Sequence, residues 1–363
     1  MDKINSLKVN IRIDGRLSVY IRILMAIILG GIVTTWIFTE LTKSHTVFIQ
    51  NISLTFVYGL AFSILLFLMT SGFFLIFGLA DVINFAHGAF FMLGGFLGYE
   101  FYLFTESLLL TNPFFADNPY LLSFFSFISA LLGATLILGI IGGGIEIFTV
   151  RRLYGKPISQ ILLTVGFLYI ILQLTDILWV SDRSYDYITG SKTQTFWLSR
   201  SNVIDIGLGI QFEVYRIFLV FFGLILAVIL FLIISKTRIG LIIQAGIEDP
   251  EMVQALGINT KRMFTLVFIA GAALSGLAGA VAVPHIPANI SVASNFLIYA
   301  FVIVVIGGAN YGRLSGTFWA SLIVGFSYTF CQYFLPGLEG VIVYLLMAVV
   351  LIFRPGGLTG EAM

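Results

Sequence analysis

The sequence predicts an all-α integral membrane protein with about ten transmembrane helices. Of its 363 residues, 59% are hydrophobic and only 10% are charged, whereas water-soluble domains carry about 25% charged residues. The mean hydropathy is +1.05. Most apolar runs have about 20 residues, the length of a spanning helix and about twice that of a membrane β-strand. Such a chain is surrounded by lipid, and its net charge of +1 gives no indication of a nucleic-acid partner.

Ten apolar segments have, or nearly have, the length of a membrane span. They lie near residues 23–39, 49–72, 86–104, 120–147, 158–180, 215–235, 263–283, 294–309, 315–335 and 339–353. The second segment stays apolar to residue 80, which is too long for one span. We therefore expect the chain to bend or break around Ser71–Gly72 or Gly78.

The first apolar segment follows a basic, polar stretch, as in a signal peptide. No small-x-small cleavage site follows it. We interpret it as an uncleaved span, with a removed signal peptide as the alternative.

Lysine and arginine stay on the cytoplasmic side in short loops of membrane proteins. With a cytoplasmic N-terminus, 14 of the 19 Lys and Arg residues fall on that side of the ten-span topology. We therefore predict that both termini are cytoplasmic. The chain then divides into a cytoplasmic basic segment (1–22), an extra N-terminal span with an outer loop (23–48) and a main membrane domain (49–363). Ten spans also divide as five plus five, which would allow two inverted halves.

Small residues recur every four positions in the segment 263–283. They form two series: Gly271, Ser275, Gly279 and Ala272, Gly276, Ala280. Small residues at this spacing let helix backbones approach closely in lipid. We interpret both series as packing surfaces, with a moving helix interface as the alternative.

The predicted cytoplasmic loop 236–262 contains the start and stop signals of a short helix. These signals are Asp249 as N-cap, Pro250 at the first position, Glu251 in the first turn and Gly257 just past the end. Met252, Val253 and Leu256 give the helix an apolar face. The helix either docks against a partner protein or rests on the bilayer.

The stretch VINFAHGAFF (82–91) places polar side chains between two apolar runs. Polar residues at membrane depth usually face a cavity or a partner, and a helix that starts near Asn84 or Gly88 would direct its N–H groups at an anion such as a carboxylate. One interpretation is a solute path lined by Asp81, Asn84, His87 and Gly88. The alternative is structural, with Asn84 and His87 capping a helix break. A protonation switch at His87 is a third hypothesis.

Other polar residues near the span ends have simpler interpretations. We expect Glu100, Glu146 and Asp176 to pair or to extend toward water, and His285 to lie in an outer loop. The outer loop 181–214 is either a landing surface for a binding protein or an ordinary solvated loop.

Three motifs resemble those of one transporter family. INFAHGAFFMLGG (83–95), RIGLIIQAGIEDPEMVQALGIN (238–259) and FRPGGLTG (353–360) are similar to stretches in the permease subunits of branched-chain amino acid ABC importers, a group that includes urea and short-chain amide permeases. The basic loop with TVRRLYGKP (149–157) also fits this family. The N-terminal extra span and the outer segment 105–119 depart from its pattern.

The resemblance implies a set of partners. Residues 49–363 would form the permease domain, and the short helix would couple to an ATPase through Glu248, Asp249, Pro250, Glu251, Met252, Leu256 and Gly257. The implied partners are two ABC ATPase subunits, a second permease subunit, which in this family is usually a paralogue, and an external or periplasmic solute-binding protein. The chain lacks a G-x-x-x-x-G-K-[ST] phosphate-binding loop. We therefore expect that this chain is not the subunit that hydrolyses nucleotide. The resemblance implies no catalytic residues, metal site or cofactor in it, and ATP with Mg²⁺ in the partner ATPases.

The resemblance also implies a location in the cell inner membrane and a small polar solute, with branched-chain amino acids first and urea or short-chain amides as the alternative. Two other classes remain open. An ion-coupled secondary transporter would need a carboxylate cluster deep among the helices, and a channel or scaffold would need no moving gate.

Overall fold

The structure is a computed structural model that describes residues 45–80, 82–180, 203–205, 211–248, 250–308, 314–354 and 356–359, and a few positions between 22 and 33. Most of the predicted basic segment 1–22 and of the first span 23–39 therefore lies outside the described residues, as does Asp81.

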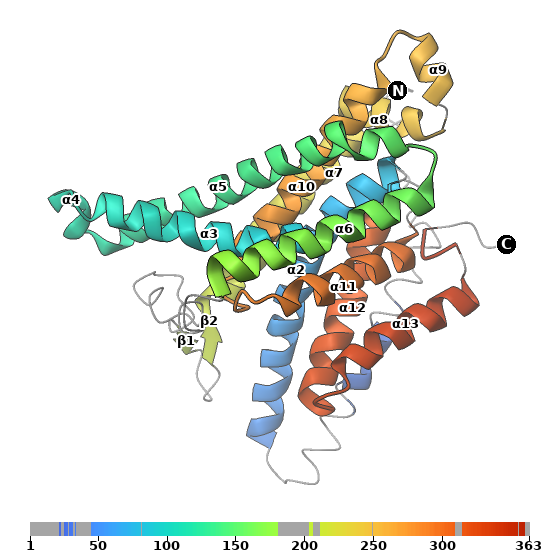
Figure 1. Ribbon diagram of the computed structural model, residues 1–363. Coiled ribbons are helices and arrows are strands. Elements are labelled where there is room, and N and C mark those ends of the chain that lie inside the picture. The colour runs from blue at the N-terminus through green and yellow to red at the C-terminus, as the bar shows by residue number, and fades with distance from the viewer. Residues whose placement is uncertain are drawn as a thin grey trace, which may run out of the picture.

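The described chain is almost entirely helical (Figure 1). Its elements are α2 (His45–Ala80), α3 (His87–Leu109), α4 (Pro113–Ala116), α5 (Pro119–Phe148), η2 (Val150–Leu153), α6 (Pro157–Thr175), η3 (Asp176–Val180), β1 (Val203–Asp205), β2 (Gln211–Glu213), α7 (Val214–Lys236), α8 (Arg238–Glu248), α9 (Pro250–Ala255), α10 (Thr260–Ala282), α11 (Ser291–Gly307), α12 (Leu314–Phe334) and α13 (Glu339–Phe353).

Six of the described helices are long and apolar enough to cross a membrane, which supports the prediction of an all-α membrane protein. They are α2, α5, α6 with its π-helical end, α7, α10 and α12. The apolar helices α11 and α13 have 17 and 15 residues. At about 1.5 Å per residue they are shorter than the hydrocarbon core of about 30 Å. The count of ten spans and the inverted halves stay predictions.

Helix α2 continues without interruption through Ser71, Gly72 and Gly78, so the predicted break at these residues is wrong. The Ser71 hydroxyl donates a hydrogen bond to the Leu68 carbonyl at 2.6 Å, which satisfies its polar group inside the helix. Gly72 allows α2 to lie close to Gly271 and does not bend the helix, because a Cβ atom there would collide with the carbonyl of Gly271. The chain leaves the helix only between α2 and α3, at residues 82–86.

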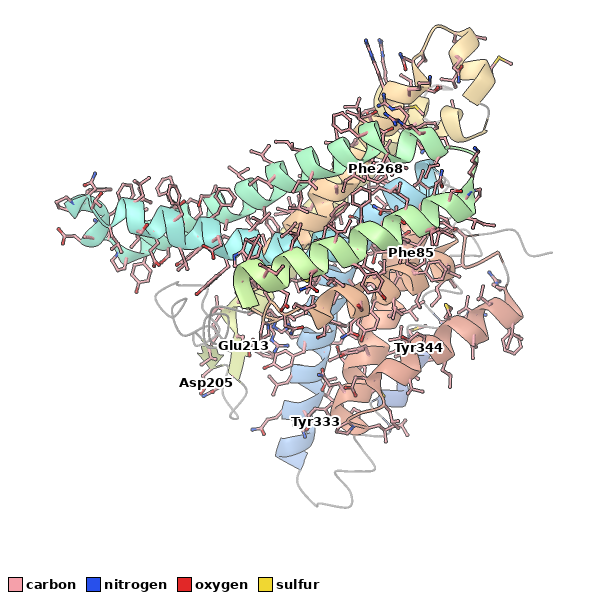
Figure 2. All side chains as sticks on the ribbon, in the orientation of Figure 1. Phe85, Asp205, Glu213, Phe268, Tyr333 and Tyr344 are labelled. Atoms are coloured by element: carbon pink, nitrogen blue, oxygen red, sulfur yellow. The ribbon has the colours of Figure 1, made fainter. Side chains whose placement is uncertain are left out.

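Helix α10 lies at the centre of the bundle and packs against α2, α3 and α5 (Figure 1). Its Phe268, labelled in Figure 2, is fully buried. A Cβ atom on Gly271 would lie 2.6 Å from the Gly72 carbonyl, and one on Gly276 would lie 2.8 Å from Leu138 Cβ. These contacts confirm the predicted packing role of both small-residue series.

The C-terminal motif closes the end of α11. Gly308 ends this helix with a left-handed backbone (φ 86°). The Leu358 amide donates to the Ile306 carbonyl at 2.7 Å, and the Thr359 hydroxyl donates to the Gly307 carbonyl at 2.6 Å. Residues 356–359 thus satisfy carbonyl groups that a helix C-terminus leaves without partners.

Two features lie at opposite ends of the bundle (Figure 1). At one end, α8 and α9 extend beyond the other helices. At the other end, β1 and β2 form an antiparallel hairpin, in which Ile204 is paired with Phe212. The sequence did not predict this hairpin within the outer loop. It leads directly into α7 and so positions the first turn of that helix.

We predict that Thr359→Val lowers the free energy of unfolding by about 1–3 kcal/mol, because it leaves the buried Gly307 carbonyl with a weaker set of donors. Thermal unfolding of the protein in detergent would measure the change. Thr111→Val is the matched control, because the Thr111 hydroxyl bonds to Leu108 on an exposed surface. Equal effects of the two substitutions would contradict the assigned role of the C-terminal motif.

Candidate functional site

The break between α2 and α3 is held by side chains that replace missing helical hydrogen bonds. The Asn84 Oδ1 atom accepts a bond from the Ala86 amide at 3.0 Å. From the neighbouring helix α6, Thr164 Oγ1 accepts a bond from the Phe85 amide at 3.1 Å. Backbone polar groups that leave a helix at membrane depth need such partners, so Asn84 and Thr164 allow the chain to turn here.

His87 is fully buried at the first position of α3. Its Nε2 atom lies 3.0 Å from the Met69 carbonyl of α2. A carbonyl only accepts hydrogen bonds, so Nε2 carries a proton, and in the neutral ring Nδ1 is then an acceptor. Neither His87 Nδ1 nor Asn84 Nδ2 has a hydrogen-bond partner among the described residues. One acceptor and one donor are thus left open beside the break.

Gly88 permits a close approach of α3 to α11. A Cβ atom there would collide with the Ala293 carbonyl and lie 2.7 Å from Leu297 Cβ. The structure therefore shows that Asn84, His87 and Gly88 make structural contacts at the break. A role of these residues in a solute path stays a prediction, and Asp81 lies outside the described residues.

A larger polar cavity of about 570 Å³ lies at the end of the bundle where α10 meets α11. It is formed by α2, the start of α7, the segment between α10 and α11, α11 itself and α12. The residues that line it are Tyr58, Phe62, Arg216, His285, Ile286, Pro287, Asn289, Ser291, Val292, Asn295, Phe296, Tyr299, Tyr328, Thr329 and Gln332. We call it the outer cavity, because the predicted topology places this end of the bundle on the outer side. His285, predicted to be an outer-loop residue, lines this cavity.

Aromatic rings form one side of the outer cavity. The ring centroids of Phe62 and Tyr328 are 4.7 Å apart, and those of Phe296 and Tyr299 are 5.7 Å apart. Phe62 and Phe296 meet edge to face at 6.3 Å. Such rings offer an apolar contact surface to an aliphatic group, and the Tyr hydroxyls add hydrogen-bonding capacity.

Arg216 supplies the permanent positive charge among the residues that line the outer cavity. Its Nε atom donates to Glu213 Oε2 at 2.7 Å, and its guanidinium carbon lies 3.4 Å from the centroid of the Tyr58 ring. Glu213 ends β2, just before α7 (Figure 2). The charge is therefore held in a fixed position by a carboxylate and an aromatic face.

Sequence reasoning missed most of the outer cavity. The signal that could have found it is a pair of large polar or aromatic residues four positions apart near the predicted outer ends of the spans, namely Asn295 with Tyr299 and Tyr328 with Gln332. Residues four apart lie on one helix face. In an apolar helix, such a pair indicates a face that does not meet lipid.

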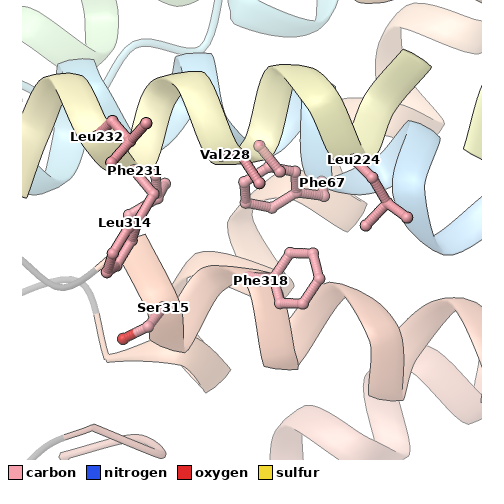
Figure 3. A pocket seen from close by; sticks show the side chains of 9 residues that line it. Phe67, Leu224, Val228, Phe231, Leu232, Leu314, Ser315 and Phe318 are labelled. Carbon is pink, nitrogen blue, oxygen red and sulfur yellow. The ribbon is translucent and has the colours of Figure 1, made fainter. Parts of the chain in front are cut away.

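A second, smaller cavity of about 280 Å³ opens between α2, α7 and α12 (Figure 3). Its lining is apolar except for Ser315, and it includes Phe67, Val228 and Phe318. Such a groove cannot replace the hydration of a charged solute. The outer cavity is therefore the better candidate. Among the described residues, no group of three His, Cys, Asp or Glu side chains could hold a metal ion.

The predicted short helix exists as α9, and Gly257 follows it with a left-handed backbone (φ 81°), as the predicted stop signal requires. The apolar residues of α9 differ in their exposure. Val253 is buried, whereas Met252 and Leu256 are 59% and 73% exposed. Asp249 lies outside the described residues, and Glu248, Pro250 and Glu251 are described by backbone alone. The side chains of Met252 and Leu256 form an exposed apolar surface on α9.

Residues 55–351 match the family described as branched-chain amino acid transport system, permease component. The chain is 28% identical over 298 residues to the high-affinity branched-chain amino acid transport system permease protein BraD of Pseudomonas aeruginosa, a match that covers 81% of this chain and 91% of the relative. It is 26% identical over 297 residues to the LivH permease protein of Escherichia coli, with the same coverage. A probable LivH protein of Methanocaldococcus jannaschii is 25% identical over 313 residues, or 83% of this chain and 90% of the relative. No solved structure matches.

We predict that Asn84→Ala lowers the free energy of unfolding by about 1–2 kcal/mol, because the Ala86 amide then loses its acceptor beside a helix start. Unfolding in detergent and solute uptake should both be measured for this variant and for His87→Ala. If a variant is less stable, and its uptake falls only as much as its amount of folded protein, the result supports the capping role. Unchanged stability with lost uptake would contradict it and favour the solute path.

Proposed function

Because this chain belongs to the family of branched-chain amino acid transport permease components, we propose that it is the membrane permease subunit of a binding-protein-dependent ABC importer. The importer moves branched-chain amino acids across the cell inner membrane. The relatives named above carry this activity in their names, and the match spans most of both chains. The chemical step, ATP hydrolysis, belongs to partner subunits.

The assignment of the solute rests on the outer cavity. A branched-chain amino acid has a carboxylate, an ammonium group and an aliphatic side chain. The cavity offers the Arg216 guanidinium beside Glu213, and an aromatic surface around Phe62 and Phe296. Urea and short-chain amides are the alternative solutes. They would use the side-chain amides of Asn289, Asn295 and Gln332, but they have no charge for Arg216 to bind.

The same proposal assigns the partners. Two ABC ATPase subunits bind ATP and Mg²⁺ and contact α9 at the exposed side chains of Met252 and Leu256. A second permease subunit completes the membrane pair, and an external binding protein delivers the solute at the end of the bundle that holds the outer cavity. ATP binding moves α9, and the helices pass from outward to inward access.

The proposed topology has ten spans, two inverted halves of five and both termini in the cytoplasm. The clustering of Lys and Arg in short loops on one side supports the ten spans and the cytoplasmic termini, and the inverted halves rest on the division of ten spans into five plus five. Residues 1–22 form a cytoplasmic segment, 23–48 an extra span with an outer loop, and 49–363 the permease domain. The match over residues 55–351 supports the last assignment.

The break between α2 and α3 belongs to the inner part of the proposed solute path. Asp81, Asn84, His87 and Gly88 are its proposed residues. The open donor of Asn84 and the open acceptor of His87, both fully buried, support this role.

We predict that Arg216→Gln lowers leucine uptake by the assembled importer at least about tenfold, the loss expected for one hydrogen bond to a charged group. Arg216→Lys should restore part of the uptake, because it keeps the charge but not the fork of donors. Uptake of radiolabelled leucine into proteoliposomes is the measurement.

Arg152→Gln is the control for this substitution, since Arg152 is exposed in η2 and far from the outer cavity in sequence. Unchanged leucine uptake by Arg216→Gln would contradict the carboxylate contact. Uptake of urea but not leucine by the unmodified importer would establish the alternative solute.

We predict that Leu256→Glu weakens binding of the ATPase subunits by more than about tenfold, because a charge would replace the centre of an apolar contact. Co-purification and ATPase activity in detergent measure this. Leu338→Glu is the matched control, because Leu338 is 49% exposed in the turn between α12 and α13. Full retention of the ATPase subunits by Leu256→Glu would show that α9 does not dock them.

A further inference from the structure

An ionic cluster around a buried carboxylate lies where α5 ends and α10 begins. Glu146, which is fully buried near the end of α5, accepts hydrogen bonds at both carboxylate oxygens. Its Oε1 atom accepts from Arg151 Nε at 3.1 Å and from the Tyr154 hydroxyl at 2.8 Å. Its Oε2 atom accepts from Arg151 Nη2 at 2.9 Å and from the Thr265 hydroxyl at 2.8 Å. We call these four residues the Glu146 cluster.

The cluster is more than a local pairing of charges. Arg151 and Tyr154 lie in and just after η2, within eight residues of Glu146, but Thr265 lies on α10, 119 residues away. Arg151 also bonds to Thr265 directly. The guanidinium of Arg151 is charged, as arginine is in proteins, and its hydrogen bond to Glu146 raises its pKa further. A buried carboxylate with four charge-assisted or hydroxyl donors resists displacement, because losing any donor leaves a buried oxygen with fewer hydrogen bonds, and losing Arg151 would also leave its charge without compensation.

The coupling helix α9 is tied to the same end of α10. The Gln254 side chain donates from Nε2 to Thr260 Oγ1 at 3.0 Å, and Thr260 is the first residue of α10. Asn259 caps this helix by accepting a bond from the Arg262 amide at 3.1 Å. Buried Val253 faces inward while Leu256 stays exposed. A displacement of α9 therefore acts on the first turns of α10, one turn before Thr265.

The opposite end of α10 continues into the wall of the outer cavity. The amides of His285 and Ile286 both donate to the carbonyl of Ala282, the last residue of α10, at 2.9 and 2.7 Å. Both residues line the outer cavity. Tyr215 of α7, the residue before Arg216, also donates a hydrogen bond from its hydroxyl to the Val281 carbonyl of α10. One helix of 23 residues, about 35 Å long, thus joins α9 to the cavity.

We propose that the Glu146 cluster locks the inner end of α10 to α5 and η2, so that a displacement of α9 moves α5 and α10 as one body and shifts the wall of the outer cavity. This rests on the proposed function as an ATP-driven importer. Without the lock, the first turns of α10 rotate on their own, and the displacement is lost before it reaches the cavity. Thr265 and Glu146 are thus positioning residues for the coupling of ATP hydrolysis to transport.

Thr265→Val tests the lock, because valine keeps the shape of threonine and removes the hydroxyl that joins α10 to Glu146 and Arg151. The same hydroxyl also bonds to the Lys261 carbonyl of its own helix at 2.9 Å. The measurement is the number of leucine molecules transported per ATP hydrolysed, in proteoliposomes that contain the complete importer. We expect this ratio to fall at least about fivefold, the lower end of typical coupling between sites, while the ATPase subunits stay bound and ATP hydrolysis continues. A purely structural role would lower transport and hydrolysis together.

Two further variants keep the test decisive. Tyr154→Phe removes a different donor to Glu146 and retains the ring, which packs at 5.4 Å from Phe264; it should lower the ratio less than Thr265→Val does. Thr135→Val is the control, because among the described residues the Thr135 hydroxyl bonds only to the Leu131 carbonyl of its own helix α5. This substitution should leave the ratio unchanged.

An unchanged ratio in Thr265→Val and Tyr154→Phe overturns the inference, and so does a proportional loss of transport and hydrolysis. Absence of ATP-dependent leucine uptake in the unmodified complex is a different result, because it overturns the proposed function itself.

Discussion

Backbone contact along α10 is the constraint on which the rest of the structure depends. Lipid tails are as apolar as leucine, so helices in a membrane gain little from the hydrophobic effect and associate through close packing. Along α10, Gly271 faces Gly72 of α2, Gly276 faces Gly94 of α3, and Gly279 meets the backbone at Phe91. Any side chain at these positions would separate the helices. The three neighbours of α10 are therefore held at fixed positions around it.

This packing places two chemically different ends on one body. One end carries α9, whose Met252 and Leu256 are exposed and apolar, as a protein contact requires. The other end carries the outer cavity, where Arg216 and aromatic rings suit a small charged solute. Glu146 and the C-terminal segment around Thr359 tie the helices together by hydrogen bonds that are independent of the glycine contacts. An importer subunit needs this combination, because its energy source and its solute act on opposite sides of the membrane.

The sequence predicted the features that depend on local signals. The segments 120–147 and 215–235 correspond to α5 and α7, and the Pro250 and Gly257 signals correspond to the limits of α9. The expected break in α2 at Gly72 was wrong. A glycine in a membrane helix can allow the close approach of a neighbouring backbone, or it can allow the helix to bend. Local sequence cannot distinguish these two uses.

Features that join distant segments could not be predicted in the same way. Glu146 was expected to pair or to extend toward water, and the structure shows that it pairs, but its bond to Thr265 depends on the rotation of two helices about their axes. The outer cavity combines α2, α7, α11 and α12, and only Asn295 with Tyr299 and Tyr328 with Gln332 gave a local hint of it. The roles predicted for Asn84 and His87 remain open between capping and solute contact, because both kinds of role use the same residue types.

The central claim is that motion generated at α9 reaches the outer cavity through α10. It is tested most directly by the distance between spin labels at Asn289 and Gln332, on two sides of the cavity, after replacement of the free Cys331. In the complete importer, binding of ATP to the ATPase subunits should shift this distance distribution. An unchanged distribution in a complex that binds and hydrolyses ATP would contradict the account.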